Sequence, residues 1–285
     1  SINGGASAAV NNPLSFTDGI HTVTLTATDN AGNVTQTTQP IQVDTITPTL
    51  NTSLNGTSGS NGWYVSNVTI TPSASDSGSG LASLEVSTDG NAYTTYQSPI
   101  TFTDGIHTYQ FRATDNAGNV TETIQQTIKV DVVTPAISLN IAGTSGTGGW
   151  YISNVTITPI VNDSTSGISS LEASADGGAW TAVNELSFSD GLHTYQFRVT
   201  DNASNVTIIP VQNLKIDTIF PVISMTEEID LGDWLEYNLQ DDGSGLSIVR
   251  VVIEDEDERF PKVAWEEHIS GDKFKDEFRW DGKFK

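Results

Sequence analysis

The chain has 285 residues and no cysteine, and its 35 acidic and 12 basic residues give a formal net charge of −23. This composition argues against nucleic-acid binding, which needs clustered Lys and Arg. It also argues against insertion of this segment into a membrane, because no apolar run reaches roughly 18 residues. Without cysteine there are no disulfides and no thiolate metal sites.

A seven-residue motif recurs at a fixed interval along the chain. Asp29–Thr35 (DNAGNVT) returns as Asp115–Thr121 and, with Ser204 in place of glycine, as Asp201–Thr207. Successive motifs start 86 residues apart, which is the size of a small domain with its own core. The repeat therefore predicts a string of similar domains, with segments at 1–46, 47–133, 134–219 and 220–285.

Residues 1–46 are predicted to be the C-terminal part of one such repeat. Their Asn3-Gly4-Gly5 corresponds to Asp176-Gly177-Gly178 in a later repeat, so they hold its last strands only. The chain begins in mid-repeat, without the charged and apolar regions of a signal peptide. We therefore expect it to be part of a longer protein.

Residues 47–133 alternate apolar and polar side chains with a period near two, which predicts short strands separated by Asp-Gly and Asn-Gly turns. Val65, Val68 and Ile70 are the expected inward positions of one strand, and Leu81, Leu84 and Val86 those of the next. Seven strands in one repeat predict an immunoglobulin-like β-sandwich. The expected strands, A to G in that fold, are 50–54, 65–74, 81–87 (strand C), 93–96 (C′), 100–102 (E), 107–114 (F) and 120–130 (G).

Residues 134–219 repeat this pattern, and residues 220–285 form a divergent, highly charged and incomplete version of it. The last segment holds 18 of the 35 acidic residues, including the run Glu254–Glu258, which we expect to be a solvated loop. Its Asp242–Leu246 corresponds to Asp76–Leu81. Short linkers ending in proline, at 43–48, 130–135 and 216–221, favour limited bending between domains. The predicted fold class is all-β: tandem seven-stranded immunoglobulin-like sandwiches in an elongated array.

Three motifs resemble the bacterial immunoglobulin-like repeats of large secreted and cell-surface proteins. They are the stretch Gly62–Thr69 (GWYVSNVT), the stretch Asp76–Leu81 (DSGSGL) and the motif Asp115–Asn119 (DNAGN). The linker pattern Val-Asp-Thr-x-x-Pro at 43–48 is similar to that family too. The resemblance covers nearly the whole chain and implies adhesins, stalks or multimodular extracellular glycosidases.

Catalysis has no support in the sequence, and we expect a protein that is not an enzyme. His21, His107 and His193 occupy one position in three repeats, each two residues after an Asp-Gly turn, which indicates a structural role. No nucleophile elbow, phosphate loop or histidine metal motif is present.

Calcium is the best chemical hypothesis. In a seven-stranded sandwich the B–C and F–G loops lie at the N-terminal end of the domain, beside the preceding linker. This topology groups Asp44, Asp76 and Asp115, and in the next repeat Asp131, Asp163 and Asp201. Calcium binds carboxylate and amide oxygens, so Asn116 and Asn202 complete the predicted site, with Asn119 as a further donor. The alternative is that the Asp-Asn-Ala-Gly-Asn motif is only a tight hairpin turn.

Other polar and aromatic residues have competing interpretations. Trp180, in the C–C′ hairpin, is the best exposed candidate for a sugar platform, whereas Trp63 and Trp150 are expected to cover the core. The Asn-Val-Thr sequons are glycosylation acceptors only in a host with that machinery; otherwise they combine turn asparagines with strand threonines. They begin at Asn33, Asn67, Asn119, Asn154 and Asn205.

The sequence therefore predicts a non-catalytic segment of a long extracellular stalk, adhesin or fibre, at the cell surface. The alternative is a set of spacer or glycan-binding modules of a secreted polysaccharide-degrading enzyme. Expected partners are neighbouring repeats, with surface glycans or a host cell-surface protein as further candidates. Residues 1–46 and 220–285 supply complementary strands, which suggests head-to-tail self-assembly. The alternative is that these are arbitrary ends of a fragment, and the change of composition after Phe220 favours that alternative.

Overall fold

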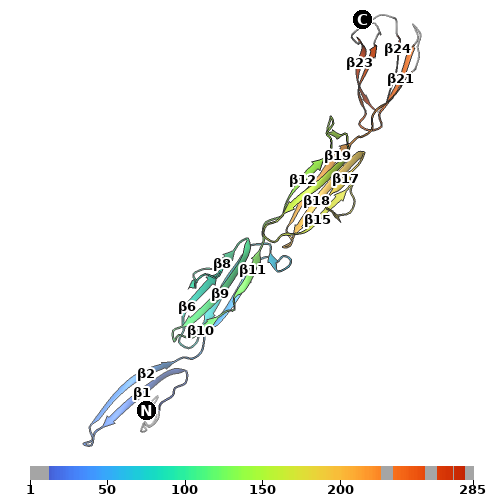
Figure 1. Ribbon diagram of the computed structural model, residues 1–285. Coiled ribbons are helices and arrows are strands. Elements are labelled where there is room, and N and C mark those ends of the chain that lie inside the picture. Colours follow the sequence, from blue (N-terminus) through green and yellow to red (C-terminus); the bar gives the residue numbers. More distant parts are fainter. Residues whose placement is uncertain (1–12, 226–233, 254–261, 272, 280–285) are drawn as a thin grey trace. The chain divides into compact units, whose positions relative to one another are not determined.

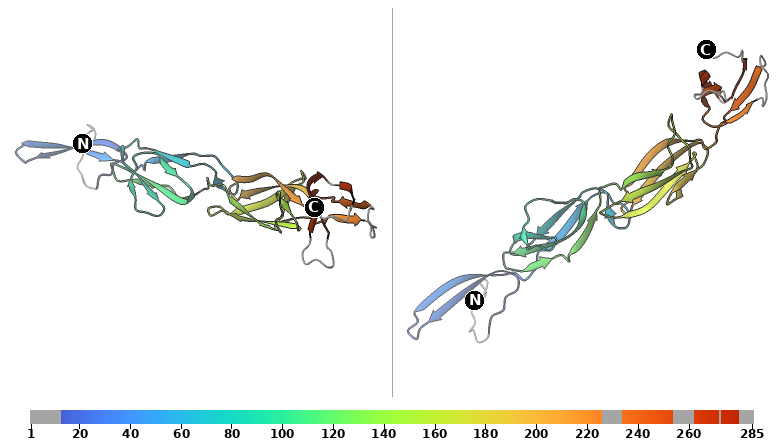
Figure 2. Two further views of the ribbon diagram at one scale, coloured as in Figure 1. Left: turned by 90° about the horizontal axis from the view of Figure 1, so that it is seen from above. Right: turned by 45° about the horizontal axis from the view of Figure 1, so that its top comes forward.

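The computed structural model describes residues 13–225, 234–253, 262–271 and 273–279. Every regular element in this part of the chain is a β-strand (Figure 1, Figure 2), which confirms the all-β prediction. Among these residues there is consequently no apolar helix of membrane-spanning length. The predicted loop Glu254–Glu258 and the turn Asn3-Gly4-Gly5 lie outside the described residues. The chain forms two compact units, residues 1–133 with 202–205, and residues 134–201 with 206–285.

The first described element is a hairpin of β1 (Gly19–Thr28) and β2 (Val34–Val43), shown in blue in Figure 1. The strands pair antiparallel from Gly19↔Val43 to Thr28↔Val34. The first copy of the seven-residue motif makes the turn, where the Asp29 carboxylate accepts hydrogen bonds from the amides of Ala31 and Asn33. Gly32 has a φ of 90°, a conformation that favours glycine.

The next part of unit 1 is a sandwich of two sheets with the immunoglobulin-like arrangement. One sheet has the order β3-β5-β8, and the other has the order β4-β11-β9-β6-β7, with β10 also paired to β9. Figure 1 labels β8 in the first sheet and β9 in the second. The strands are β3 (Thr49–Asn55), β4 (Trp63–Tyr64), β5 (Val68–Ser75), β6 (Leu81–Thr88), β7 (Thr94–Thr95), β8 (Ile100–Phe102), β9 (Gly105–Asp115), β10 (Val120–Glu122) and β11 (Gln126–Val130).

The strand count differs from the expected seven. The short strand β4 pairs in parallel with the end of β11, which the alternation of residues did not predict. The predicted last strand, 120–130, is divided into β10 and β11. At the break the Thr123 hydroxyl and amide both bond to main-chain atoms of Phe111, in place of a regular ladder. The side chain of Thr123 thus substitutes for one strand partner.

The core of this sandwich comes from alternate residues of both sheets. Val68, Ile70 and Phe111 are fully buried, as the period-two pattern predicts for the first two. The β6–β9 register shifts between Leu81 and Ser83, which places Leu81 opposite the buried Asp115 and on the same face as Leu84 and Val86, as expected. Leu81 is still 37% exposed, because it is the first residue of its strand. The core cluster consists of Val68, Ile70, Val86, Phe102, Tyr109, Phe111, Ile128 and Val130.

Unit 2 begins with a sandwich of the same plan. Its sheets have the orders β12-β14-β17 and β13-β19-β18-β15-β16, and Phe197 fills the core position of Phe111. The strands are β12 (Ala136–Ala142), β13 (Trp150–Tyr151), β14 (Val155–Asn162), β15 (Ile168–Ala175), β16 (Thr181–Ala182), β17 (Leu186–Phe188), β18 (Gly191–Asp201) and β19 (Val206–Ile216).

The last part of unit 2 repeats the first half of this plan. Its sheets are β20-β21-β24 and β22-β23. Since β20-β21-β24 has the same order as β12-β14-β17, the divergent segment starts with the strands that were expected of it. The strands are β20 (Val222–Met225), β21 (Trp234–Gln240), β22 (Leu246–Ile253), β23 (Lys262–Gly271) and β24 (Lys273–Arg279).

Candidate cation site

Three aspartates of unit 1 converge where the linker after β2 meets the first complete sandwich. Asp44 comes from the linker, Asp76 from the β5–β6 loop and Asp115 from the end of β9. One carboxylate oxygen of each lies within 4.8 Å of the other two. The sequence predicted this grouping from the loop positions of the fold; the structure brings the three side chains together, and their role as ligands stays a prediction.

Asp44 fixes the linker to the β5–β6 loop. Its Oδ2 accepts a 2.6 Å hydrogen bond from the Ser79 amide, and its Oδ1 accepts one from the Ile46 amide at 3.1 Å. The bonds from Ser79, and then the bond from Ile46, hold the pKa of the Asp44 carboxyl below its usual range. Gly78 lies so close that a Cβ there would overlap the Asp44 carboxylate, so this position needs glycine. Asp44 is therefore ionised at neutral pH and held against the loop.

Asp76 has one satisfied and one unsatisfied oxygen. Its Oδ1 accepts hydrogen bonds from the amides of Gly78 and Gly80, at 3.1 and 2.8 Å, which closes the loop. Its Oδ2 is buried and has no hydrogen-bond partner among the described residues. A buried carboxylate oxygen without a donor is costly, so a missing partner is the ordinary explanation.

Asp115 is 2% exposed and is held by the residue that ends its own turn. Its Oδ1 accepts the Asn119 main-chain amide and its Oδ2 accepts the Asn119 side-chain amide, both at 2.8 Å. The same Asn119 nitrogen also donates to the carbonyls of Asp44 and Ile46 in the linker. The motif therefore forms a hairpin turn, which is the alternative to calcium binding considered above, and it also contacts the linker.

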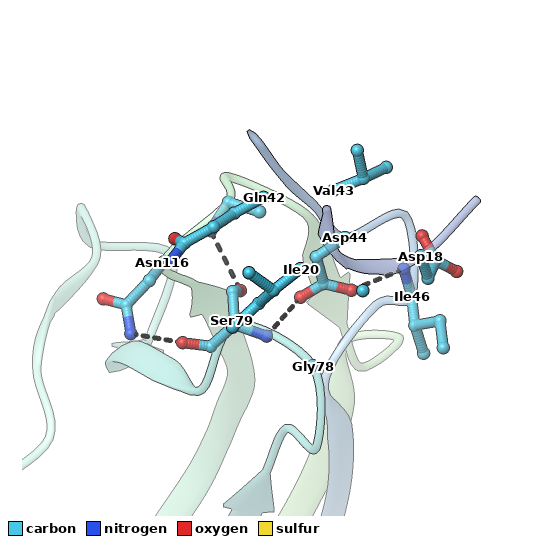
Figure 3. A pocket seen from close by; sticks show the side chains of 11 residues that line it. Asp18, Ile20, Gln42, Val43, Asp44, Ile46, Gly78, Ser79 and Asn116 are labelled. Carbon is cyan, nitrogen blue, oxygen red and sulfur yellow. Dashed lines mark hydrogen bonds between the residues drawn. The ribbon is translucent and has the colours of Figure 1, made fainter. Parts of the chain in front are cut away.

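Asn116 braces the β5–β6 loop. Its Nδ2 donates to the carbonyls of Ser79 and Gly80, at 2.9 and 3.1 Å. Beside it is a hollow of about 400 Å³, bounded by the β1–β2 hairpin and the loop, and Figure 3 shows the bonds from Asn116 and Asp44 to Ser79 along its wall. The nitrogen of Asn116 thus has a structural role; calcium ligation by its oxygen stays a prediction.

The residues present suit a hard divalent cation. Calcium takes six to eight oxygen ligands from carboxylates, carbonyls and water. The site offers three carboxylates, of which Asp115 is buried and the other two are half-buried, and one buried oxygen, Asp76 Oδ2, without a donor among the described residues. Three carboxylates this close repel one another unless a cation or protons offset their charge. The donor set and the orphaned oxygen therefore fit calcium.

The corresponding aspartates of the next repeat belong to both units: Asp131 to unit 1, and Asp163 and Asp201 to unit 2. In unit 2, Asp163 and Asp201 have carboxylate oxygens within 4.8 Å of each other, and Asp163 Oδ1 accepts the amides of Thr165, Ser166 and Gly167. In unit 1, Asp131 is fully buried. Asp131 accepts the Val133 amide, as Asp44 accepts that of Ile46.

Asn202, the remaining predicted ligand, accepts a bond at its main-chain oxygen from the Asn61 side chain. This bond involves the Asn202 backbone and leaves the predicted ligand role of its side chain untested.

A third pair of aspartates was missed by the sequence analysis. Asp217 Oδ2 accepts the Ser244 amide at 2.6 Å, and Asp241 Oδ2 accepts the Gly245 amide at 2.6 Å. Asp241, which is 4% exposed, is thus the counterpart of Asp76, whereas the sequence comparison assigned Asp242 to that position. The signal that identifies Asp217 is the Ile-Asp-Thr linker, which repeats the Val-Asp-Thr of Asp44.

The repeated histidines have structural contacts. His193 Nδ1 lies 3.0 Å from Asp176 Oδ2, and its Nε2 lies 3.0 Å from the Ser189 carbonyl oxygen. His107 makes the same two contacts with Asp89 and Thr103. Each ring joins two turns of its own sandwich, as the sequence analysis expected.

Trp180 is half-buried and has the Arg198 guanidinium 4.7 Å from its ring centroid. Tyr93 and Arg112 form the same pair at 4.2 Å. Because the cation covers one face of each ring, these aromatics are poor platforms for a sugar. Lys129 and Lys215 lie likewise over Trp63 and Trp150, at 5.8 Å.

Two family models match the repeats and identify their kind. Residues 54–132 match a family model described as a bacterial Ig-like domain, and residues 3–45 and 154–218 match a second model of the same description. No curated protein matches the chain.

Three solved structures are similar to the chain at low sequence identity. Fibronectin(III)-like modules of Clostridium thermocellum CbhA are 17% identical over 58% of this chain and 93% of theirs, with a TM-score of 0.27. A tetra-tandem repeat from the extending region of a large adhesion protein is 15% identical over 93% and 82%, with a TM-score of 0.32. A Ca²⁺-stabilised adhesin with which an Antarctic bacterium binds ice is 13% identical over 92% and 80%, with a TM-score of 0.30.

Proposed function

Because the matched segments are bacterial immunoglobulin-like repeats in tandem, we propose that the chain is a non-catalytic spacer of a long extracellular stalk, adhesin or fibre. Its repeats are the segments 1–46, 47–133, 134–219 and 220–285, and its location is the cell surface. Spacer or glycan-binding modules of a secreted polysaccharide-degrading enzyme are the second candidate. The covered rings of Trp180 and Tyr93 favour the spacer over a glycan-binding module.

The observation that carries the proposal is how the first linker is bonded. Its carboxylate, at Asp44, and its carbonyls, at Asp44, Ile46 and Pro48, all bond to loops or strands of the sandwich that follows. The Thr45 amide and hydroxyl bond to the Asp18 carboxylate of the preceding hairpin. A linker fixed in this way resists bending, which a spacer requires and a flexible tether between catalytic modules does not.

Calcium completes the junction in this proposal. Asp44, Asp76 and Asp115 hold the ion at the first junction, and Asp131, Asp163 and Asp201 hold one at the next. The ion supplies positive charge among carboxylates of a chain whose formal net charge is −23, and it gives Asp76 Oδ2 its missing partner. Because the three aspartates come from the linker and from two loops, a bound ion ties the linker to the sandwich.

Partners follow from the same features. Neighbouring repeats are the first partners. The β1–β2 hairpin also exposes apolar residues: Leu25 is 57% exposed, whereas Phe111, at its equivalent position in β9, is fully buried. This face can pair with strands of a second copy, which would give head-to-tail assembly. Electron microscopy tests this: fibres that disappear on deletion of residues 1–46 support the assembly, and monomeric particles at micromolar concentration refute it.

Small-angle scattering of the full chain tests the spacer role. In millimolar calcium we expect one extended, well-defined particle, and in chelator a broader distribution of sizes. A compact globule in both conditions contradicts the proposal. A glycan array serves as the test of the second candidate: selective binding of one polysaccharide class, lost in Trp180→Ala, would favour the accessory-module function.

A further inference from the structure

Asn119 lies at the point where the turn, the predicted cation site and the linker meet. Its side-chain nitrogen is 2.8 Å from Asp115 Oδ2, 3.0 Å from the Asp44 carbonyl oxygen and 3.3 Å from the Ile46 carbonyl oxygen. An amide nitrogen carries two hydrogens, so this single group is shared among three acceptors. Two residues later, the Thr121 hydroxyl donates to the Pro48 carbonyl at 2.6 Å.

The same contacts recur at the equivalent residues of the next motif. Asn205 Nδ2 is 3.0 Å from the Asp131 carbonyl oxygen and 3.3 Å from that of Val133. Thr207 Oγ1 is 2.6 Å from the Pro135 carbonyl oxygen. The repetition, atom for atom, indicates that Asn-Val-Thr in this motif serves the linker.

The chain also contains a copy of the motif that serves as a natural control. Asn33 Nδ2 donates to Asp29 Oδ2 at 2.8 Å, which is the bond of Asn119 to Asp115. Both Asn33 and Asp29 are exposed, and neither forms part of the carboxylate cluster of unit 1. Among the described residues, Asn33 therefore makes the turn bond of Asn119 and no hydrogen bond to a linker carbonyl.

We propose that Asn119 is a positioning residue that clasps the linker through its side-chain nitrogen. The nitrogen holds the linker backbone and the Asp115 carboxylate in one arrangement, so that Asp44 and Asp115 are in place before a cation binds. From the sequence, a different role is expected for Asn119, as an oxygen ligand of calcium. The part of this inference that concerns calcium affinity rests on the proposed function; the clasp itself does not.

The substitutions Asn119→Asp and Asn119→Ala together separate the two roles. Asn119→Asp keeps the size and the oxygen but places a negative oxygen against the Asp115 carboxylate and two carbonyls, which repels them in chelator for either role. Asn119→Ala removes the donor without adding charge, so it loosens the linker in chelator only if Asn119 is a clasp. If Asn119 acts only as an oxygen ligand, Asn119→Ala leaves the chelator state unchanged and Asn119→Asp binds calcium more tightly, because a carboxylate replaces an amide.

The experiment uses the full chain, which has no cysteine of its own. Spin labels on Thr28→Cys and Thr95→Cys report the distance between hairpin and sandwich by electron double resonance. We expect Asn119→Asp to broaden the distance distribution in chelator and to lower the melting temperature, while Asn33→Asp leaves the distribution as in the wild type. Unchanged distribution and melting in chelator for Asn119→Ala, which loses the donor without gaining charge, overturn the proposal.

A further variant and a further measurement keep the result interpretable. Thr121→Val removes only the bond to Pro48 and should also broaden the distribution, which covers the case in which Asn119→Asp does not fold. Asn119→Ala should weaken calcium binding about 10- to 100-fold, as loss of a residue that orients a metal ligand does. If the wild type binds no calcium, the proposed cation site fails while the chelator measurement still decides on the clasp.

Discussion

At the scale of single residues, two repeats that share a plan show which side chains are interchangeable. Tyr93 and Trp180 occupy the same position, and each lies under an arginine. The Tyr93 hydroxyl is buried without a hydrogen-bond partner among the described residues, and burial raises its pKa. Trp180 has no hydroxyl, so the second repeat avoids this cost.

Tyr93→Phe should therefore leave the first complete sandwich as stable as before, or more stable by up to about 1 kcal/mol. Removing an unsatisfied buried hydroxyl removes its desolvation cost and keeps the ring under Arg112. Urea unfolding, followed by fluorescence, measures the change. A loss of more than about 1 kcal/mol would show that the hydroxyl has a partner, such as an ordered water.

His193 gives unit 2 a predictable dependence on pH. The hydrogen bond that the Asp176 carboxylate accepts from His193 raises the pKa of His193, burial opposes this, and the hydrogen bond to the Ser189 carbonyl adds to the rise. A folded-state pKa above the unfolded value of about 6.5 stabilises the fold fully below that pH. The contribution is lost as the pH rises through the folded-state pKa. Since Asp176 is half exposed, the effect should not exceed about 1 kcal/mol.

His193→Gln should remove this contribution, so that the melting temperature of unit 2 no longer falls between pH 6 and pH 8. Calorimetry across that range is the measurement, and Asp176→Asn, which removes the other partner, is the control and should behave alike. A wild-type melting temperature that rises over this interval would contradict the assignment.

At the scale of elements, the linker and the β5–β6 loop fit together at one glycine. Gly78 leaves the space that the Asp44 carboxylate occupies, and Gly243 does the same for Asp217. In each case the amide of the residue after the glycine donates a hydrogen bond to that carboxylate, Ser79 to Asp44 and Ser244 to Asp217. The glycine is thus required by a close approach of two chain segments.

Gly78→Ala should displace Asp44 from the loop and lower the melting temperature of unit 1. The exposed neighbour Ser77 provides the matched control, because Ser77→Ala should change stability by no more than about 0.5 kcal/mol. If both variants melt with the wild type, the close contact between linker and loop is not present in solution.

The strands were largely predictable, and the exceptions have local causes. The strand Ile100–Phe102 and the inward positions Val68 and Ile70 follow from alternation. Leu81, three residues before Leu84, shares the face of Leu84 only through a register shift, which a period of two cannot indicate. The division of the last strand depends on a side chain, Thr123, that bonds across the sheet.

The candidate site was predictable in its carboxylates and not in its geometry. Topology places Asp44, Asp76 and Asp115 at one end of the fold. The orientation of the Asn119 amide and the unpartnered oxygen of Asp76 depend on side-chain rotamers, which no sequence pattern specifies. Asp241 was assigned one residue too late, because the adjacent Asp242 matches the pattern equally well.

At the scale of the whole molecule, the chain consists of repeats whose linkers are held by hydrogen bonds. Each sandwich has its own core, with Phe111 in one and Phe197 in the other, so each repeat contributes its own stability. In the array, hydrogen bonds from each sandwich restrict the bending of the linker that precedes it. In the proposed function, bound calcium restricts this bending further.

Calcium titration of the full chain by calorimetry, repeated with Asp76→Asn and Asp163→Asn, tests this central claim most directly. The account predicts that the wild type binds calcium and melts at a higher temperature, because each ion adds about 2.7 kcal/mol of stabilisation at 100 times its Kd. Each substitution should remove one bound ion and the stabilisation that this ion adds, while the variants in chelator should be at least as stable as the wild type, because each has lost one negative charge. No heat of binding and no change in melting at millimolar calcium would contradict it.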